Sequence, residues 1–474
     1  MKGLVIMANK EKSAGKVLQE KLFSQRKNGI LKLDHSEVEK IDSFCEGYKR
    51  FLDNAKTERE AVSTAVNMAK DCGYSEYDPK KKYQSGDRVY YNNRGKSLIL
   101  CVFGTEPMEN GVKINAAHID SPRLDLKQHP LYESSDLALL KTHYYGGIKK
   151  YQWATIPLAL HGVIIKANGE KVDVCIGEDD SDPVFVVTDL LPHLAQEQSK
   201  RALPDVIKGE ELNVLIGSRP FNDDEVSEKV KLSILSILFD KYGIIEDDFM
   251  SAELEVVPAF KAKDVGLDRG LVGAYGQDDR VCAYTALMAA LECENPVSTC
   301  VTVLTDKEEI GSVGNTGLSS EYLKHFIYSI AEGAGTNCPT VLSHSTCLSA
   351  DVSVAFDPTF PEVCESMNSS YCNYGVAMCK YTGSRGKGGC SDANAEFVAY
   401  VRSIFDSNGV IWQTSELGRV DLGGGGTVAA YVANLGIDVV DVGVPVLCMH
   451  APFEVTAKLD VYMAYKGFSV YLKN

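Results

Sequence analysis

The sequence predicts an α/β protein in which a mixed sheet is covered by helices on both faces. From residue 255 onward, short apolar runs typical of buried strands alternate with stretches of helical periodicity. Between about residues 126 and 253, strand-like runs follow one another instead, which indicates a separate β-rich unit. With 474 residues, 45% hydrophobic and 24% charged, the chain has a globular composition and the length of two or three domains.

The first part of the chain is expected to begin with helix and continue with two strands. Apolar residues recur at helical spacing between residues 35 and 73, and Ser36 with Glu39 has the spacing of a capping box. The runs "SLILCVFG" at 97–104 and "GVKINAAHID" at 111–120 are typical of short buried strands.

The middle and last parts differ in the elements they predict. In the middle, Asn168-Gly169 between two alternating runs predicts a hairpin with a type I′ turn, and a helix is expected over 227–242. We therefore expect a discontinuous first domain, 1–124 and 255–474, interrupted by a β-rich domain over 125–254. The last part predicts strands near 255–260, 298–306, 345–356, 409–415 and 438–450, with helices near 281–293, 320–330, 391–405 and 427–436 and at the end.

Charge and composition exclude several classes of function. A formal net charge of −16 repels phosphate backbones and anionic lipids, so we expect neither nucleic acid nor membrane as a partner. No stretch approaches 18 apolar residues and no signal peptide is recognisable at the start, so a cytoplasmic protein is expected. The 14 cysteines include no CxxC pair, which favours reduced core thiols. Any metal must then be held by His, Asp and Glu.

Polar clusters stand at the ends of the expected strands, where α/β sheets place their ligands. Each cluster alone has an ordinary explanation: a hydrogen-bonded core histidine, a solvated acidic pair, or an acidic first turn of a helix. Their joint occurrence favours a functional site instead. The clusters are His118 with Asp120, Asp278 with Asp279 and Arg280, Glu308 with Glu309, Asp351, and His450.

These residue types suit a hydrolytic site with two metal ions. His118 would be a ligand and Asp120, two residues on along the same strand face, would orient its ring. Of Glu308 and Glu309, one could bind metal while the other acts as general base. Asp278 is the candidate to bridge two cations. Zinc fits this donor set, and cobalt or manganese are alternatives.

The sequence resembles the aspartyl aminopeptidase / aminopeptidase I family of dinuclear zinc metallopeptidases over essentially its whole length. The resemblance is carried by "NAAHIDSPRLDLK", "GQDDR", "DKEEIGS", "SADVS" and "MHAPFE", in that order, and by "YYGGIKKYQW" and "DLLPHLAQ" in the middle part. It implies a zinc-exopeptidase-like catalytic domain, with an inserted β-rich domain for dimerisation.

The resemblance also implies roles for individual residues. One zinc would be bound by His118 and Asp351 and the other by Glu309 and His450, with Asp278 bridging them. Glu308 matches the family's general base, and Asp120 the residue behind the first His ligand. The bridging Asp of the family is commonly followed by a cis peptide bond, here Asp278–Asp279. The family assembles as a tetrahedral dodecamer built from dimers, in which the residue matching His193 reaches the neighbouring active site.

The expected function is therefore a metal-dependent aminopeptidase that removes the first residue of short peptides by attack of a dimetal-bound water, with Glu308 as general base. An acidic first residue would need a cation in the specificity pocket, which Lys380, Arg385 or Lys387 could supply. The glycine-rich stretch around them departs from the family pattern and leaves neutral substrates open. The alternatives are another dinuclear hydrolase reaction, such as deacylation or carboxypeptidase cleavage, and an inactive cage.

Overall fold

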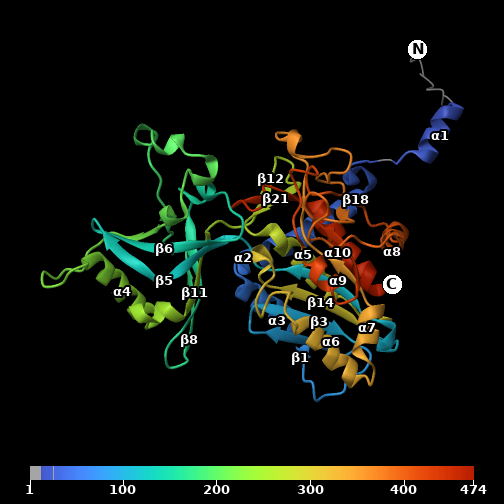
Figure 1. Cartoon of the computed structure of the whole chain (residues 1–474), viewed down its shortest axis with the longest axis horizontal. Helices are drawn as coiled ribbons and strands as arrows, with labels where there is room; N and C mark the ends of the chain where they lie inside the picture. Colours follow the sequence, from blue (N-terminus) through green and yellow to red (C-terminus); the bar gives the residue numbers. More distant parts are fainter. Residues whose placement is uncertain (1–11, 25) are drawn as a thin grey trace, which may run out of the picture.

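The computed structural model describes residues 12–24 and 26–474. Figure 1 shows two lobes: an α/β body that contains both the early and the late parts of the chain, and a β-rich lobe formed by its middle part. The expected α/β class, with a separate β-rich unit, is confirmed. Helix α1 (Ala14–Leu22) stands away from the body and buries none of its residues.

The body is built on a nine-stranded mixed sheet. Its centre consists of four parallel neighbours, β14, β4, β15 and β19, so their carboxyl ends lie at one edge. Strands β3 and β17 flank this centre in the antiparallel direction. The sheet order is β1 (Ser75–Glu76), β2 (Arg88–Asn93), β3 (Ser97–Val102), β14 (Cys300–Thr305), β4 (Lys113–His118), β15 (Thr346–Ser349), β19 (Asp438–Gly443), β17 (Val376–Cys379), β18 (Trp412–Thr414).

Helices cover both faces of this sheet because successive strand residues point to opposite sides. In β4, Ile114 and Ala116 pack into one core cluster while Ala117 packs into the other. The first core contains helices α6 (Tyr322–Gly333), α7 (Cys338–His344) and α9 (Ala429–Ala433). The second contains α2 (His35–Asn54), α3 (Glu58–Asp71), α5 (Gln277–Leu291), α8 (Ala395–Ser407) and α10 (Lys458–Lys473).

The helical start of the body forms as two helices, and its cap differs from the expected one. The N-cap of α2 is Asp34, whose side chain accepts from the Glu37 amide while Glu37 reaches back to the Asp34 amide. Ser36 lies inside the first turn and donates its hydroxyl to Asp34. Asp was a competing capping residue two positions earlier, with its own Glu three residues later. Helix α3 begins behind a second capping box, Thr57 with Glu60.

The β-rich lobe is a seven-stranded sheet whose pairings are all antiparallel, with α4 (Lys229–Tyr242) packed on it. The expected hairpin forms, but its turn is not type I′. Among the loop residues only Gly169 has a positive φ, of 86°, and its amide donates to the Lys166 carbonyl. The order is β8 (Lys171–Ile176), β7 (Leu158–Ile165), β11 (Ala252–Pro258), β5 (Arg123–Ser134), β6 (Leu137–Tyr145), β10 (Val214–Gly217), β9 (Val186–Val187).

A third, five-stranded sheet was not expected. It takes β16 and β20 from runs that were interpreted as single strands over 345–356 and 438–450. Both runs leave the nine-stranded sheet after one strand and enter the small sheet with the next. The order is β12 (Lys263–Val265), β13 (Leu271–Ala274), β21 (Glu454–Ala457), β20 (Pro445–Leu447), β16 (Ser353–Val354).

Two further expectations concern the chain as a whole. All 14 cysteines lie among the described residues, and all are free, as expected of reduced thiols. Within residues 12–24 and 26–474, none of the helices combines the length and the apolar character that crossing a membrane requires.

Candidate metal centre

The candidate site lies where the parallel strands of the nine-stranded sheet end. His118 is the last residue of β4 and is fully buried. Its Nε2 atom lies 3.3 Å from Asp278 Oδ1 and 3.8 Å from Asp351 Oδ1. Asp351 follows β15, the neighbour of β4. One imidazole nitrogen and two carboxylates therefore converge from three segments that are far apart in the sequence.

A second group of ligand atoms lies on the other side of Asp278. His450 Nε2 is 3.0 Å from Asp278 Oδ2 and 3.4 Å from Glu309 Oε2. Within each of the two sets, His118–Asp278–Asp351 and Asp278–Glu309–His450, the possible ligand atoms lie within 4.8 Å of one another. Because the two oxygens of Asp278 face different histidines, its carboxylate is shared by both sets, which is the arrangement of a bridging ligand.

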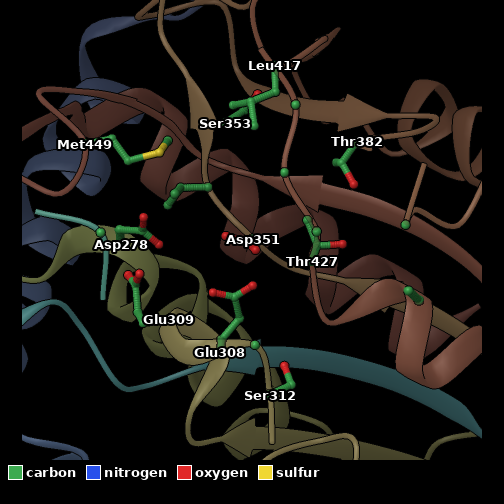
Figure 2. Close-up of a pocket in the computed structure, with 18 of the residues that line it drawn as sticks. Asp278, Glu308, Glu309, Ser312, Asp351, Ser353, Thr382, Leu417, Thr427 and Met449 are labelled. Atoms are coloured by element: carbon green, nitrogen blue, oxygen red, sulfur yellow. The ribbon is translucent and has the colours of Figure 1, made fainter. Parts of the chain in front are cut away.

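Glu308 is the remaining carboxylate at this centre. Figure 2 shows the carboxylates of Asp278, Glu308, Glu309 and Asp351 turned toward one common space. Glu308 follows the end of β14 and opens a short 3₁₀ turn, Glu308–Ile310, and its Oε2 lies 3.8 Å from His118 Nε2. It belongs to neither set of ligand atoms. It therefore has the position of a free carboxylate beside the candidate metal sites.

The crowded carboxylates of the site would be stabilised by a positive charge between them. Burial and then Asp351 raise the pKa of Glu308 to about 8, and burial with Asp278 raises the pKa of Glu309. Burial also raises the pKa of Asp351. For Asp278 burial opposes ionisation, but its interactions with His118 and His450 outweigh burial and lower the pKa. Crowded carboxylates of this kind are stabilised when cations bind between them.

Two orphaned polar atoms show that the donor set fits metal ions. His118 Nε2 and Glu309 Oε1 are buried and have no hydrogen-bond partner in the part of the chain that the structure describes. Leaving such groups unpaired is costly, and each belongs to one of the two candidate sets. Imidazole nitrogens and carboxylate oxygens are donors that zinc accepts. No cysteine belongs to either set, as the sequence predicts.

Asp120 holds several parts of the site together. Its Oδ1 lies 3.3 Å from His118 Nδ1 and accepts the Glu308 amide at 3.1 Å. Its Oδ2 accepts the Glu309 amide at 3.2 Å. The side chain is fully buried. Asp120 thus fixes both the first histidine and the turn that carries the two glutamates.

Asp278 stands at the start of α5, where the backbone is not helical. Asp278 and Asp279 have non-helical φ and ψ angles, and the peptide bond between them is cis, as the resemblance implies. Arg280 donates to the carbonyls of Ile119 and Lys56, which ties the start of α5 to the end of β4. These contacts place Asp278 between the two histidines.

Glu454 was not predicted as a site residue, although it lies inside the motif "MHAPFE". Its Oε1 accepts the His450 amide at 2.7 Å, and its Oε2 accepts the Asp278 amide at 3.0 Å. Burial and Asp278 raise its pKa to about 8. One buried carboxylate therefore sets the backbones of two candidate ligands. In the sequence, this role was indicated by the position of Glu454 four residues after His450.

A cavity of about 480 Å³ opens above the candidate ligands. Away from them its wall is neutral: of the described residues that line it, none is Lys or Arg. Apolar or weakly polar surface comes from Leu417, Met449, Val352, Ala430 and Cys379. Hydroxyls and glycines make up the rest, namely Ser312, Ser353, Thr382, Thr427, Tyr431, Gly147, Gly311, Gly389 and Gly424 to Gly426.

The two expected substrate-binding residues lie outside this cavity. His193 is exposed in a short 3₁₀ turn of the β-rich lobe, Pro192–Leu194. Lys380 Nζ pairs with Asp392 Oδ1 at 2.6 Å, and Lys387 pairs with the other Asp392 oxygen at 2.7 Å. Arg385 and Lys387 line a second cavity that adjoins the first and shares Thr382, Leu417 and Gly424 with it. Within one chain, none of these cations is directed at the candidate centre.

A further group of possible ligands, Glu60, His161 and Cys175, lies where the β-rich lobe meets α3. There His161 Nδ1 is 2.7 Å from Glu60 and Nε2 is 3.1 Å from Glu178. Lys56 and Lys261 both pair with Glu178. Because both ring nitrogens already have carboxylate partners, ion pairing accounts for this group.

Comparison with known proteins gives concordant matches. Residues 51–472 match the family described as aminopeptidase I zinc metalloprotease (M18). The chain is 51% identical over 461 residues to a "Probable M18 family aminopeptidase 1" of Clostridium acetobutylicum, covering 96% of this chain and 99% of the relative. An M18 aminopeptidase crystal structure from Thermotoga maritima superposes with a TM-score of 0.90 at 42% identity, covering 95% of this chain and all of that one. The S. cerevisiae mApe1 dodecamer, at 20% identity, has a TM-score of 0.74 and covers 91% of this chain and 96% of that one.

Proposed function

Because the chain belongs to the aminopeptidase I zinc metalloprotease (M18) family and is a metal-dependent aminopeptidase, we propose that its catalysis takes place at the centre around Asp278. The observation that carries the proposal is that one oxygen of the Asp278 carboxylate faces His118 and the other faces His450. Glu308 lies beside them and belongs to neither set of ligand atoms. The reaction is the removal of the N-terminal residue of short peptides.

We propose that each chain holds two divalent ions, most simply zinc, with cobalt and manganese as alternatives. His118 and Asp351 would hold one, Glu309 and His450 the other, and Asp278 would contact both. The buried, unpartnered His118 Nε2 and Glu309 Oε1 support this assignment. When bound, such ions polarise a scissile carbonyl and lower the pKa of water in the site.

The chain's own residues then supply proton transfer and orientation. Glu308 lies beside the shared carboxylate and takes a proton from the attacking water, which it passes to the leaving amine. Asp120 keeps Glu308 in place through the backbone amide and keeps the His118 ring oriented. The concentration of carboxylates around the cavity attracts the free α-ammonium group of a peptide.

For the first residue of the substrate we propose a neutral side chain. An acidic side chain would need a cation at the cavity, and the described lining has none. Lys380 and Lys387 both pair with Asp392 and do not line the cavity. Leu417 and Met449 offer apolar surface to an uncharged side chain. We further propose that the enzyme acts in the cytoplasm, where its 14 free thiols stay reduced.

The test compares free and amine-blocked Leu, Met, Asp, Glu and Lys substrates on zinc-loaded enzyme, beside Glu308→Gln and the exposed control Glu332→Gln. We expect turnover of free-amine substrates only, with Leu and Met ahead of Asp and Glu. Glu308→Gln should retain two metals per chain and lose about 10²- to 10⁴-fold in kcat, because a general base contributes that much. The control should match wild type.

Several outcomes would contradict the proposal. Hydrolysis of the blocked substrates would favour a deacylase. Wild-type kcat in Glu308→Gln would remove its assigned role. Preference for Asp or Glu would show that the neutral wall does not set specificity. By contrast, the proposal expects that chelation of the metal abolishes all turnover until metal is restored.

A further inference from the structure

The β-rich lobe sends one short segment into the candidate metal centre. Strand β6 ends at Tyr145, and Gly146 and Gly147 follow it. The Tyr145 hydroxyl donates to Asp120 Oδ2 at 2.8 Å, and the Gly147 carbonyl lies 2.8 Å from His450 Nδ1. Gly146, with φ of 75°, packs against Glu309 so closely that an added Cβ would lie 3.3 Å from it. Three consecutive residues therefore touch three residues of the site.

Of these three contacts, the hydrogen bond from Tyr145 to Asp120 affects the largest number of residues in the site. Asp120 accepts the Glu308 and Glu309 amides and faces the His118 ring. The two glutamate amides thus depend on the orientation of one fully buried carboxylate, and His118 Nδ1 faces that carboxylate while also lying 3.1 Å from the Asp120 backbone carbonyl. The Tyr145 hydroxyl is its only side-chain donor apart from His118 among the described contacts. A donor to a charged acceptor in a buried site orients it strongly.

Tyr145 is in turn held in place by a buried charged cluster. Arg123 lies directly opposite Tyr145 in the register of β5 and β6, and its guanidinium lies 3.9 Å from the ring centroid. Arg123 pairs with Asp125 at 2.8 Å, Glu255 at 3.2 Å and Glu58 at 3.4 Å. Since Glu58 belongs to α3 of the body, this cluster joins the two lobes behind the tyrosine.

We propose that Tyr145 is a positioning residue, through which the β-rich lobe completes the active site by orienting Asp120. The inference rests on the proposed roles of His118, Glu308 and Glu309. Tyr145 does not line the cavity. It acts through Asp120 alone, so its removal changes how well the base and the metal ligands are placed, while the substrate-binding wall stays the same.

The test compares Tyr145→Phe with the matched control Tyr144→Phe in the full-length, zinc-loaded protein. Tyr144 is the neighbouring tyrosine of the same strand, is 41% exposed and does not line the cavity. Zinc affinity is measured by competition with a chromogenic chelator, kcat and KM with a free-amine substrate, and folding by thermal unfolding. Loss of a partner that orients a ligand costs roughly 10- to 100-fold in metal affinity or activity.

We expect Tyr145→Phe to show that loss in zinc affinity, in kcat, or in both, with KM and the melting temperature close to those of Tyr144→Phe. Equal zinc affinity and equal kcat in the two variants would overturn the proposal. A loss of kcat that only follows a loss of folded protein would overturn it as well. Because zinc affinity is measured without turnover, a failure of the aminopeptidase reaction itself would leave this comparison readable.

Discussion

At the scale of single residues, His161 is the clearest case of a charge that stabilises the protein away from the candidate centre. Burial opposes protonation of its ring, but hydrogen bonds with Cys175, Glu178 and Glu60 raise its pKa to about 11. The same network lowers the pKa of Glu178 to about 2, against the effect of its own burial. Glu60 lies on α3 and His161 on β7, so the network spans the two lobes.

The sign of the resulting pH dependence follows from the raised pKa of His161. Its stabilising contribution is complete below the unfolded pKa of 6.5 and is lost as the pH rises toward 11. Between these limits one proton is released on unfolding, so stability falls by about 1.4 kcal/mol per pH unit. The contribution of Glu178 behaves in the opposite way and is lost only as the pH falls from 4.5 toward 2.

We predict that His161→Gln destabilises the protein most near pH 6 and progressively less as the pH rises. Urea unfolding of wild type and variant at pH 6 and pH 9 measures this difference. The exposed His143→Gln on β6 is the control and should cost little at either pH. An unchanged gap between wild type and His161→Gln at the two pH values would show that the charge of His161 does not contribute.

Individual residues also show what could be predicted from sequence. His118, Asp120, Asp278, Glu308, Glu309, Asp351 and His450 are predictable because each is a polar residue at the end of an apolar run, and the structure brings all seven together. Tyr145 was not predictable. Its approach to Asp120 depends on the register of β5 and β6, which places Tyr145 opposite Arg123, and an aromatic residue in a strand is usually core.

At the scale of elements, the end of β19 and the loop after β15 are packed without spare room. Gly443, the last residue of β19, faces the backbone of Asp351, and an added Cβ would overlap the Asp351 carbonyl oxygen. Backbone atoms cannot rotate aside as side chains do. The position of Asp351 therefore depends on the absence of a side chain at 443.

We predict that Gly443→Ala lowers stability by about 1–3 kcal/mol, the usual cost of overpacking, and weakens metal binding by displacing Asp351. Thermal unfolding and metal content per chain measure the two effects. Gly333→Ala is the matched control, because Gly333 lies in the last turn of α6 and no atom of the described residues lies within 4 Å of its added Cβ. This variant should be neutral or slightly stabilising. Full metal content and wild-type stability in Gly443→Ala would contradict the prediction.

Helices and strands could be predicted from the sequence, but the sheet that a strand joins could not always be. Most helices and central strands follow from apolar periodicity, because each buries one face or two against the body. The passage of 345–356 and 438–450 from one sheet to another was missed, since the apolar pattern runs on unchanged while the hydrogen-bond partners change. Likewise β11 is strand-like in sequence, but only its pairing with β5 and β7 shows that it belongs to the β-rich lobe.

At the scale of the whole molecule, the β-rich lobe leaves much apolar surface uncovered for a single chain. Helix α4 exposes Ile237 and Phe239, each by more than half, and carries few charges in its central turns. The segment around His193 exposes Leu190, Leu191, Leu194 and Leu203 as well. Exposed apolar groups gathered on one part of a protein favour a contact with another chain. The lobe therefore has the surface of an assembly domain as well as its contact with the active site.

From this surface we predict a homo-oligomer formed through the β-rich lobe, and the resemblance to the family implies a tetrahedral dodecamer built from dimers as the complete assembly. In that assembly His193 would approach a neighbouring active site, which would explain its exposure here.

Light scattering after size exclusion should give the mass of twelve chains. The double variant Ile237→Glu, Phe239→Glu should lower that mass, because burying two carboxylates in an apolar contact is strongly unfavourable. Val297→Glu, at an exposed apolar position on the body, is the control and should assemble as wild type does. A wild-type protein that stays a single chain at micromolar concentration would contradict the prediction, and full activity of that single chain would show that the site needs no neighbour.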